Sequence, residues 1–224
     1  MEVKFKQKVT NYKYLVMFDL ASKITGVCIY DIKNQKPLQT QVIKVAGHLE
    51  LSAAELKQQI ATFFLNLENS GISKEEILVS KERMPTQIHG GASTIQTFVA
   101  LARSHAILDV FLYENNYNTY DYLGVSPSTT HAYYKRLCGD KDIKITKEMI
   151  RDYLCAQFPE CHNLTLDESD AVFLAKTLLE VKWDSDIQEE IRAQKRHKKT
   201  LKANAAIEKV DQHIDFLNSL KINK

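Results

Sequence analysis

Residues 14–45 read YLVMFDLASKITGVCIYDIKNQKPLQTQVIKV, and this stretch carries the pattern of three consecutive β-strands. Residues 14–21 are apolar apart from one aspartate, Asp19. Residues 25–32 and 38–45 alternate between apolar and polar side chains and are rich in β-branched residues. The connections are short, so the sequence predicts an antiparallel meander at the start of the fold.

The next segments predict a helix and a fourth strand. Ser52 and Glu55 form a capping-box signature, and apolar residues then recur at helical spacing until Gly71. A short strand is expected at 76–81, followed directly by Glu82.

The second half of the chain predicts one more strand and three helices. Ser93, after the Gly90-Gly91 break, is expected to cap a long helix, and a fifth strand is expected at 120–125. Thr146 and Thr165 are expected to cap two further helices. The element order β-β-β-α-β-α-β-α-α predicts an α/β fold with a mixed five-stranded sheet flanked by helices.

Length and composition indicate one domain with an appendage. The 224 residues suffice for one good core. We expect a domain over 1–182 and a basic helical C-terminal extension over 183–224. Four apolar residues of that extension recur at heptad-like steps and suggest a protruding helix that docks on a partner. They are Ile207, Val210, Ile214 and Leu217.

Charge is informative through its distribution, because a net charge of +2 is too small to indicate a nucleic-acid-binding protein. Two stretches, 135–151 and 192–202, are rich in lysine and arginine, and phosphate contact competes there with an ordinary solvated helix face. The candidate DNA-binding residues are Lys135, Arg136, Lys141, Lys144, Arg192, Lys195, Arg196, Lys198 and Lys199.

The sequence predicts neither a membrane span nor a disulfide framework. We find no apolar run of the length that crosses a bilayer and no stretch that resembles a signal peptide. The four cysteines are scattered without a CxxC pair, which favours neither disulfides nor zinc. We expect a DNA-associated cytoplasmic protein, in the host cytoplasm if the chain is viral.

Four acidic residues are candidates for one metal site. Asp19 lies inside an apolar strand, where a charge is costly unless it is paired or bound to metal. Glu82 ends a second strand, and Asp167 and Asp170 project from one face of a helix start. Hard divalent cations prefer such oxygen ligands, and two of them about 4 Å apart can promote phosphodiester cleavage.

Ordinary explanations remain open for most of these residues. Asp167 and Asp170 could simply be acidic residues that favour a helix N-terminus. Glu82 could be a surface charge beyond the end of a strand. Asp19 is the hardest to explain without a ligand.

Several short motifs, and the order in which they follow one another along the chain, resemble those of RuvC-type Holliday junction resolvases of the ribonuclease H superfamily, including phage-type members. Asp19–Gly26 resembles the first-strand motif of the family, with Ala21 in place of a usual glycine. Glu82 falls at the place of the second carboxylate, and residues 167–172, DESDAV, resemble the closing helix motif. Residues 100–103, ALAR, resemble a helix that contributes to the homodimer interface of the family.

The resemblance implies a ribonuclease H-like fold and a crossover junction endodeoxyribonuclease. Asp19, Glu82, Asp167 and Asp170 would hold two Mg²⁺ ions, with Mn²⁺ able to substitute, and hydrolysis would leave 5′-phosphate and 3′-hydroxyl ends. Lys147 matches a family lysine near the scissile phosphate. Lys135 falls one position from the place of another such lysine. A homodimer would place two active sites on opposite arms of a four-way junction. The resemblance implies neither a nucleotide cofactor nor a membrane partner.

One departure from the family bears on specificity, and other readings compete. Pro85 stands where the family often has an aromatic residue that stacks on bases, which implies relaxed sequence specificity.

A sugar-kinase or actin-like ATPase shares the sheet order, but the chain has no second such domain. A catalytically inactive junction-binding protein, a fork or flap nuclease and an RNA-hybrid nuclease are the remaining alternatives.

Overall fold

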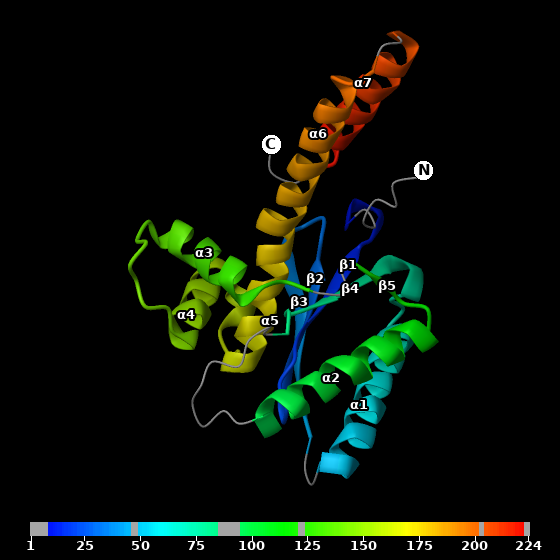
Figure 1. Ribbon diagram of the computed structural model, residues 1–224. Coiled ribbons are helices and arrows are strands. Elements are labelled where there is room, and N and C mark those ends of the chain that lie inside the picture. Colours follow the sequence, from blue (N-terminus) through cyan, green and yellow to red (C-terminus); the bar gives the residue numbers. More distant parts are fainter. Residues whose placement is uncertain (1–8, 46–48, 85–94, 121–123, 202–203, 222–224) are drawn as a thin grey trace. The chain divides into compact units, whose positions relative to one another are not determined.

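A computed structural model of the protein describes residues 9–45, 49–84, 95–120, 124–201 and 204–221 (Figure 1). Five strands form one sheet in the order β3-β2-β1-β4-β5. The chain divides into two compact units, Met1–Lys176, which holds the sheet, and Thr177–Lys224. The predicted features at Pro85, Gly90-Gly91 and Ser93 lie outside the described residues.

The N-terminal meander forms as predicted. β1 (Tyr14–Asp19) pairs antiparallel with β2 (Ile24–Asp31), and β2 pairs antiparallel with β3 (Lys36–Lys44). β1 is the central strand, and residues 15–18 are fully buried. A strand covered on both faces needs apolar side chains at successive positions, which explains the unbroken apolar run before Asp19.

Two parallel strands complete the sheet. β4 (Ile77–Lys81) pairs parallel with β1, and β5 (Asn118–Thr119) pairs parallel with β4. Parallel neighbours require a crossover connection, and a helix precedes each of these two strands along the chain. The predicted α/β fold with a mixed five-stranded sheet is confirmed.

The fifth strand differs from its prediction. The sequence predicts a strand at 120–125, whereas β5 covers only Asn118–Thr119, and residues 121–123 lie outside the described part of the chain. Gly124 has a φ of 77°, and a Cβ there would lie 2.2 Å from the carbonyl oxygen of Lys81. The backbone therefore passes too close to β4 for a regular strand with side chains.

Helices α1 (Leu49–Asn69) and α2 (Ile95–Glu114) cover one face of the sheet (Figure 1). The helix at Leu49 starts earlier than the predicted capping box, so that prediction is wrong and Ser52 lies inside α1. The Phe64 and Phe111 rings stack with centroids 5.5 Å apart and join the two helices. They belong to the core that α1 and α2 form with β1, β2 and β4.

α2 is apolar along most of its length. It has 20 residues with a mean hydropathy of 1.3, enough by length and composition alone for a membrane span, so the prediction that no segment qualifies is wrong. In this fold α2 lies on the sheet, where Leu108, Phe111 and Leu112 are buried. Only 28% of its apolar window is buried, so much of its apolar surface faces outward.

Helices α3 (Pro127–Cys138), α4 (Lys147–Gln157) and α5 (Leu166–Thr177) lie on the opposite face (Figure 1). The starts of α4 and α5 agree with their predicted caps. The Thr146 hydroxyl accepts a hydrogen bond from the backbone N–H of Met149. Thr165 and Glu168 exchange hydrogen bonds at 2.9 and 3.3 Å, which confirms the second predicted capping box.

α3 is missing from the predicted element order. Its ends carry clear signals, because Ser126 caps it, proline is its first residue, and Gly139 ends it in the left-handed conformation. Its interior gives no apolar periodicity, since the helix buries only Thr130, Tyr133 and Tyr134. Cap residues, rather than periodicity, would have identified this helix.

The C-terminal unit is a helical hairpin. A π-helical segment, η4 (Leu178–Trp183), leads into α6 (Asp184–Lys198), and α7 (Asn204–Ser219) packs against α6. The buried Trp183 indole N–H donates to the carbonyl oxygen of Leu220 over 3.0 Å and ties the two ends together. Three of the four heptad-like apolar residues are buried within this part of the chain, so no partner is needed to account for them. They are Val210, Ile214 and Leu217.

Candidate active site

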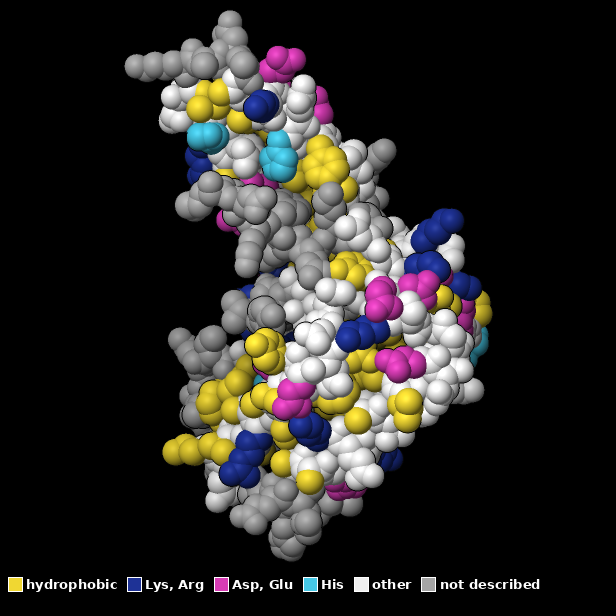
Figure 2. All heavy atoms as spheres, turned by 90° about the vertical axis from the view of Figure 1, so that its right-hand side faces the viewer, with side chains coloured by type: hydrophobic (Ala, Val, Ile, Leu, Met, Phe, Trp, Pro, Cys, Tyr) yellow, Lys and Arg dark blue, Asp and Glu magenta, His cyan; other side chains and the backbone are white. Residues whose placement is uncertain are grey.

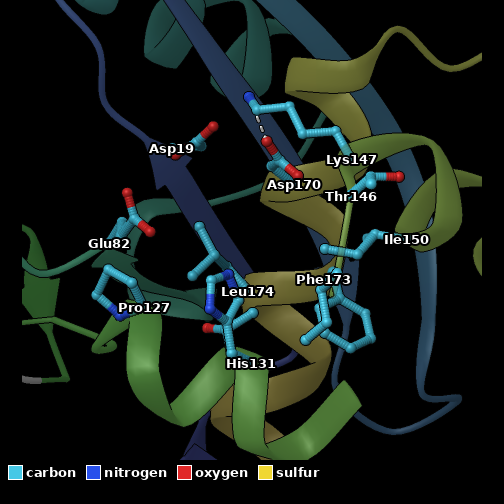
Figure 3. Close-up of a pocket in the computed structure, with 12 residues that line it drawn as sticks. Asp19, Glu82, Pro127, His131, Thr146, Lys147, Ile150, Asp170, Phe173 and Leu174 are labelled. Carbon is cyan, nitrogen blue, oxygen red and sulfur yellow. Dashed lines mark ion pairs between the residues drawn. The ribbon is translucent and has the colours of Figure 1, made fainter. Parts of the chain in front are cut away.

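Asp19 and Glu82 lie at the same edge of the sheet. Asp19 is the last residue of β1, and Glu82 directly follows β4. The backbone N–H of Glu82 donates to the carbonyl oxygen of Phe18 over 2.9 Å, which continues the parallel pairing. Because β1 and β4 run parallel, their carboxyl ends meet, and both side chains line one pocket (Figure 3).

α5 brings Asp167 and Asp170 to the same edge. The Glu168 carboxylate accepts a hydrogen bond from the Thr40 hydroxyl on β3 over 2.9 Å, which anchors the first turn of α5 to the sheet. The helix also approaches β2 closely. A Cβ on Gly26 would lie only 2.0 Å from the carbonyl oxygen of Asp167. Glycine at position 26 therefore allows α5 to lie where its aspartates reach Asp19.

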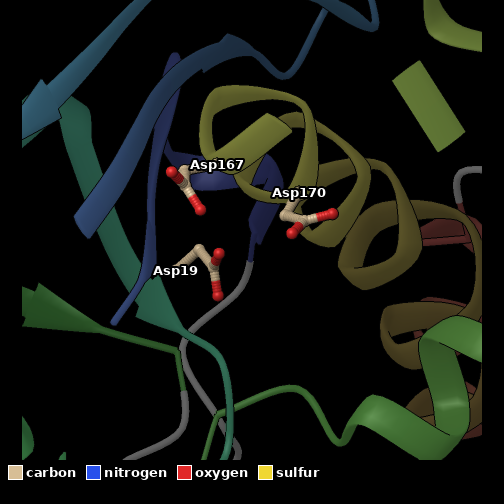
Figure 4. Close-up of side chains that lie close together, drawn as sticks. All are labelled: Asp19, Asp167 and Asp170. Atoms are coloured by element: carbon tan, nitrogen blue, oxygen red, sulfur yellow. The ribbon is translucent and has the colours of Figure 1, made fainter. Parts of the chain in front are cut away.

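Asp19, Asp167 and Asp170 form a carboxylate cluster. One oxygen from each lies within 4.8 Å of the others, and the side chains converge on a common point (Figure 4). Among the described residues, this is the cluster of acidic, histidine or cysteine side chains whose spacing suits a metal ion. Its donors are all carboxylate oxygens, which fits a hard cation such as Mg²⁺ or Mn²⁺. Glu82 is not part of this group of three but lines the same pocket as Asp19 and Asp170.

Lys147, the first residue of α4, provides a positive charge at the cluster. Its ammonium Nζ lies 2.5 Å from Asp170 Oδ2 and 3.3 Å from Asp167 Oδ1, as the dashed line to Asp170 in Figure 3 indicates. The Lys147 side chain is 51% exposed, so it can rearrange when a ligand arrives. The charges of the site thus come from β1, from the residue after β4, and from α5 and α4.

Burial shifts the acid–base equilibria of the cluster. Burial first, and the charges of Glu82 and Asp170 next, raise the pKa of Asp19 well above its usual value. Burial raises the pKa of Glu82 to about 7, although its interaction with the Asp19 carboxyl opposes the rise. Burial also raises the pKa of Asp170, against the hydrogen bond from Lys147.

Lys147 responds to the same charges in the opposite direction. Burial lowers its pKa, but the hydrogen bond to Asp170 and the surrounding carboxylates outweigh that effect and raise the pKa above its usual value. One ammonium is thus shared by several crowded carboxylates that resist ionisation. A divalent cation would supply the missing positive charge, so the residues present fit a metal centre.

Asp19, Glu82 and Asp170 line a pocket of about 220 Å³ (Figure 3). Its other walls come from α3, α4 and α5, including His131 and Phe173. His131 of α3 therefore lies in the same pocket as Asp19, Glu82 and Asp170. His131 and its neighbour Thr130 were missed from the sequence because α3 was missed.

The predicted basic residues of the first unit lie at the end of α3 and in the loop that leads to α4. Lys135 donates to the carbonyl oxygen of Lys141 over 2.7 Å. The Arg136 guanidinium lies 5.2 Å from the centre of the Tyr133 ring. Lys141 and Lys144 are both exposed to solvent, and Lys144 lies two residues before Thr146, the cap of α4. These positions permit phosphate contacts on the α4 side of the site.

Comparisons with known proteins agree with this geometry at the level of the fold. No protein-family model and no curated protein sequence matches the chain. Its fold is that of the ribonuclease H-like α/β proteins, with a mixed five-stranded sheet between helices.

Two solved structures of similar fold are RuvC structures. The RuvC of T. thermophilus in complex with a Holliday junction substrate is 14% identical, with a TM-score of 0.50, over 74% of this chain and 92% of that one. The Thermus thermophilus RuvC structure is 13% identical, with a TM-score of 0.50, over 73% of this chain and 92% of that one. At this identity the likeness concerns the fold.

Proposed function

We propose that the chain is a metal-dependent, structure-selective endonuclease that cleaves Holliday junctions and other branched DNA with relaxed sequence specificity. The observation that carries this proposal is the cluster of Asp19, Asp167 and Asp170, whose oxygens lie within 4.8 Å of one another. The RuvC-like fold supports the choice of nucleic acid as substrate. The neighbour bound to a Holliday junction supports branched DNA in particular.

The cluster residues would hold the divalent ions. Asp19, Asp167 and Asp170 would be ligands, with Glu82 joining them from the end of β4. When bound, Mg²⁺ or Mn²⁺ supplies water activation and stabilisation of the leaving oxygen in phosphodiester hydrolysis. Lys147 would neutralise charge on the scissile phosphate, because its ammonium already lies among the ligands.

The basic residues near α4 would hold the DNA backbone beside the cluster. Lys135, Arg136, Lys141 and Lys144 lie in or after the last turn of α3, and they precede Lys147 along the chain. Contacts from such residues to phosphates position a duplex without reading its sequence. This agrees with the proposal of relaxed sequence specificity.

The experiment that tests this function is cleavage of a labelled synthetic four-way junction beside a linear duplex of the same sequence. With Mg²⁺ we expect paired nicks in opposite strands of the junction and little cleavage of the duplex. With a chelator we expect none, because the ions supply the activated water. Tight junction binding by a folded protein without cleavage in Mg²⁺ or Mn²⁺ would instead indicate a binding protein.

Paired nicks require two active sites, and α2 offers a surface for a homodimer. Ile95, Val99, Val110 and Tyr113 are exposed large apolar residues of this helix, with Tyr113 79% exposed. Their spacing places them along one side of α2 together with the exposed Ala106. Figure 2 shows hydrophobic side chains exposed on the lower part of the face in view. An exposed apolar stripe of this kind favours pairing with a second copy of the chain.

A charge in this stripe should separate the dimer. We expect the double variant Val99→Glu, Val110→Glu to be a folded monomer by analytical ultracentrifugation, because both side chains are exposed in the single chain. It should nick junction strands independently instead of in pairs. Gln96→Glu, which adds a charge to an exposed residue on another side of α2, should remain dimeric. Wild-type protein that sediments as a monomer would contradict the dimer.

A further inference from the structure

Four basic side chains of the C-terminal hairpin lie along one side of α6 and of the residue that caps it, Lys199, whose backbone is still helical. Arg192, Lys195, Arg196 and Lys199 are all exposed. Their spacing of three, four and seven residues from Arg192 puts them on the same helical face, over about two turns or about 10 Å. We call these four residues the basic stripe.

The basic stripe is separate from the side of α6 that holds the hairpin together. That side carries the buried Ile187 and Ile191, and Lys198 continues the same row. Lys198 forms an ion pair with Asp211 of α7 at 2.6 Å. The ion pair gives Lys198 a role within the hairpin and places it outside the basic stripe, and DNA contact by Lys198 stays a prediction.

Hairpin stability does not explain the basic stripe. Within the stripe, four pairs of like charges lie three or four residues apart, a spacing at which like charges destabilise a helix. Residues 192–199 include no acidic residue. The nearest exposed acidic residue on that face is Glu189, and its spacing allows it to pair with Arg192 but with no other residue of the stripe.

The helix dipole explains only part of the pattern. It favours cations in the last turn of α6, where Lys195, Arg196, His197 and Lys198 lie. The dipole has no preference for one side of a helix and does not reach back to Arg192. An external polyanion would explain both the shared face and the tolerated repulsion.

We propose that the basic stripe binds the phosphate backbone of a double-stranded DNA arm. This inference rests on the proposed function, which makes branched DNA the substrate. Its length of about 10 Å matches about three successive phosphates of one strand. Two arginines among the four can bind phosphate oxygens with two hydrogen bonds each. The contact carries no base recognition, so the stripe holds a duplex arm irrespective of its sequence.

Salt-dependent binding of the full chain tests the stripe. We would measure binding to a labelled four-way junction and to a linear duplex by fluorescence anisotropy, in chelator, between 50 and 300 mM NaCl. Each phosphate contact contributes about 0.9 to the slope of log affinity against log salt. We expect the fourfold variant Arg192→Gln, Lys195→Gln, Arg196→Gln, Lys199→Gln to lose about 3 from that slope, as removal of about three phosphate contacts requires. It should bind both DNAs at least about tenfold more weakly at the lower salt concentrations.

Matched controls separate the stripe from a general loss of charge. We would compare two double variants. One removes two charges from the stripe, by Arg192→Gln with Arg196→Gln. The other removes two exposed charges elsewhere, by Lys33→Gln with Lys209→Gln. Glutamine is a good helix former, so α6 should persist by circular dichroism. The stripe double variant should reduce the salt slope by about 2, and the control pair by much less.

The outcomes distinguish this inference from the proposed function. An unchanged slope in the fourfold variant, or an equal loss in the control pair, would overturn the stripe even if wild-type protein cleaves junctions. A reduced slope would support the stripe even if no cleavage is found with any metal ion, because binding is measured in chelator.

Discussion

Replacing Asp19 by asparagine should abolish metal-dependent cleavage of a four-way junction. Asp19 is the member of the cluster that β1 places between Glu82 and the two aspartates of α5. An amide lacks the negative charge that a divalent cation requires. We expect a loss of roughly a thousandfold in cleavage rate, equivalent to about 4 kcal/mol of transition-state stabilisation. Single-turnover cleavage at saturating protein measures it, and Asp142→Asn, on an exposed loop, is the control.

The same variant should not unfold the protein. The raised pKa of Asp19 means that the folded state disfavours its ionised form. In such a group the folded state binds more protons than the unfolded state. Without metal, the contribution of this group to stability therefore falls as pH rises from the ordinary pKa of a carboxyl to the raised pKa of the folded state. Glu82, with a pKa of about 7, extends this decline to neutral pH.

Thermal unfolding in chelator between pH 4.5 and 8 measures this dependence. Relative to wild type, Asp19→Asn should gain stability as pH rises through this range and be at least as stable at pH 7, because the other titrating groups are common to both proteins. Loss of cleavage with retained stability would assign Asp19 to the chemistry. An unfolded Asp19→Asn variant, or one with wild-type cleavage, would contradict the site.

The sequence predicted the parts of the site that depend on regular secondary structure. Asp19 stands out because a charge interrupts an otherwise apolar strand, and β1 is indeed central and buried. Glu82 could be placed because parallel strands end at a common edge. Asp167 and Asp170 could be placed because the capping box of α5 fixes their position in its first turns.

Other parts of the site depend on contacts that the sequence pattern does not contain. α3 buries mostly polar and aromatic residues, so it gives no apolar periodicity, and its contribution of His131 to the pocket was missed. Lys147 was identified only through the family resemblance, because its approach to Asp170 joins residues 23 positions apart on two helices. The basic stretch of α6 was visible, but only the hairpin separates Lys198 from the exposed stripe.

Gly26 links the fold to the site, and its replacement by alanine should damage both. The added Cβ would lie 2.0 Å from the carbonyl oxygen of Asp167, a backbone atom that cannot rotate away. α5 or β2 must therefore shift, and α5 carries Asp167 and Asp170. We expect a destabilisation of about 1–3 kcal/mol, as in overpacked cores. Displacing catalytic groups by about 1 Å should also lower cleavage about a hundredfold.

Gly71→Ala separates the two consequences of the Gly26→Ala change. Gly71 has a φ of 88° but open space around its Cβ position, so alanine there strains the backbone at the end of α1 without moving α5. We expect Gly71→Ala to lower the free energy of unfolding by about 1 kcal/mol in urea titrations and to retain cleavage and Mn²⁺ affinity. Gly26→Ala should weaken Mn²⁺ binding by calorimetry at temperatures where both variants are folded. Wild-type Mn²⁺ affinity and cleavage in Gly26→Ala would show that the close approach of α5 to β2 is not what assembles the carboxylates.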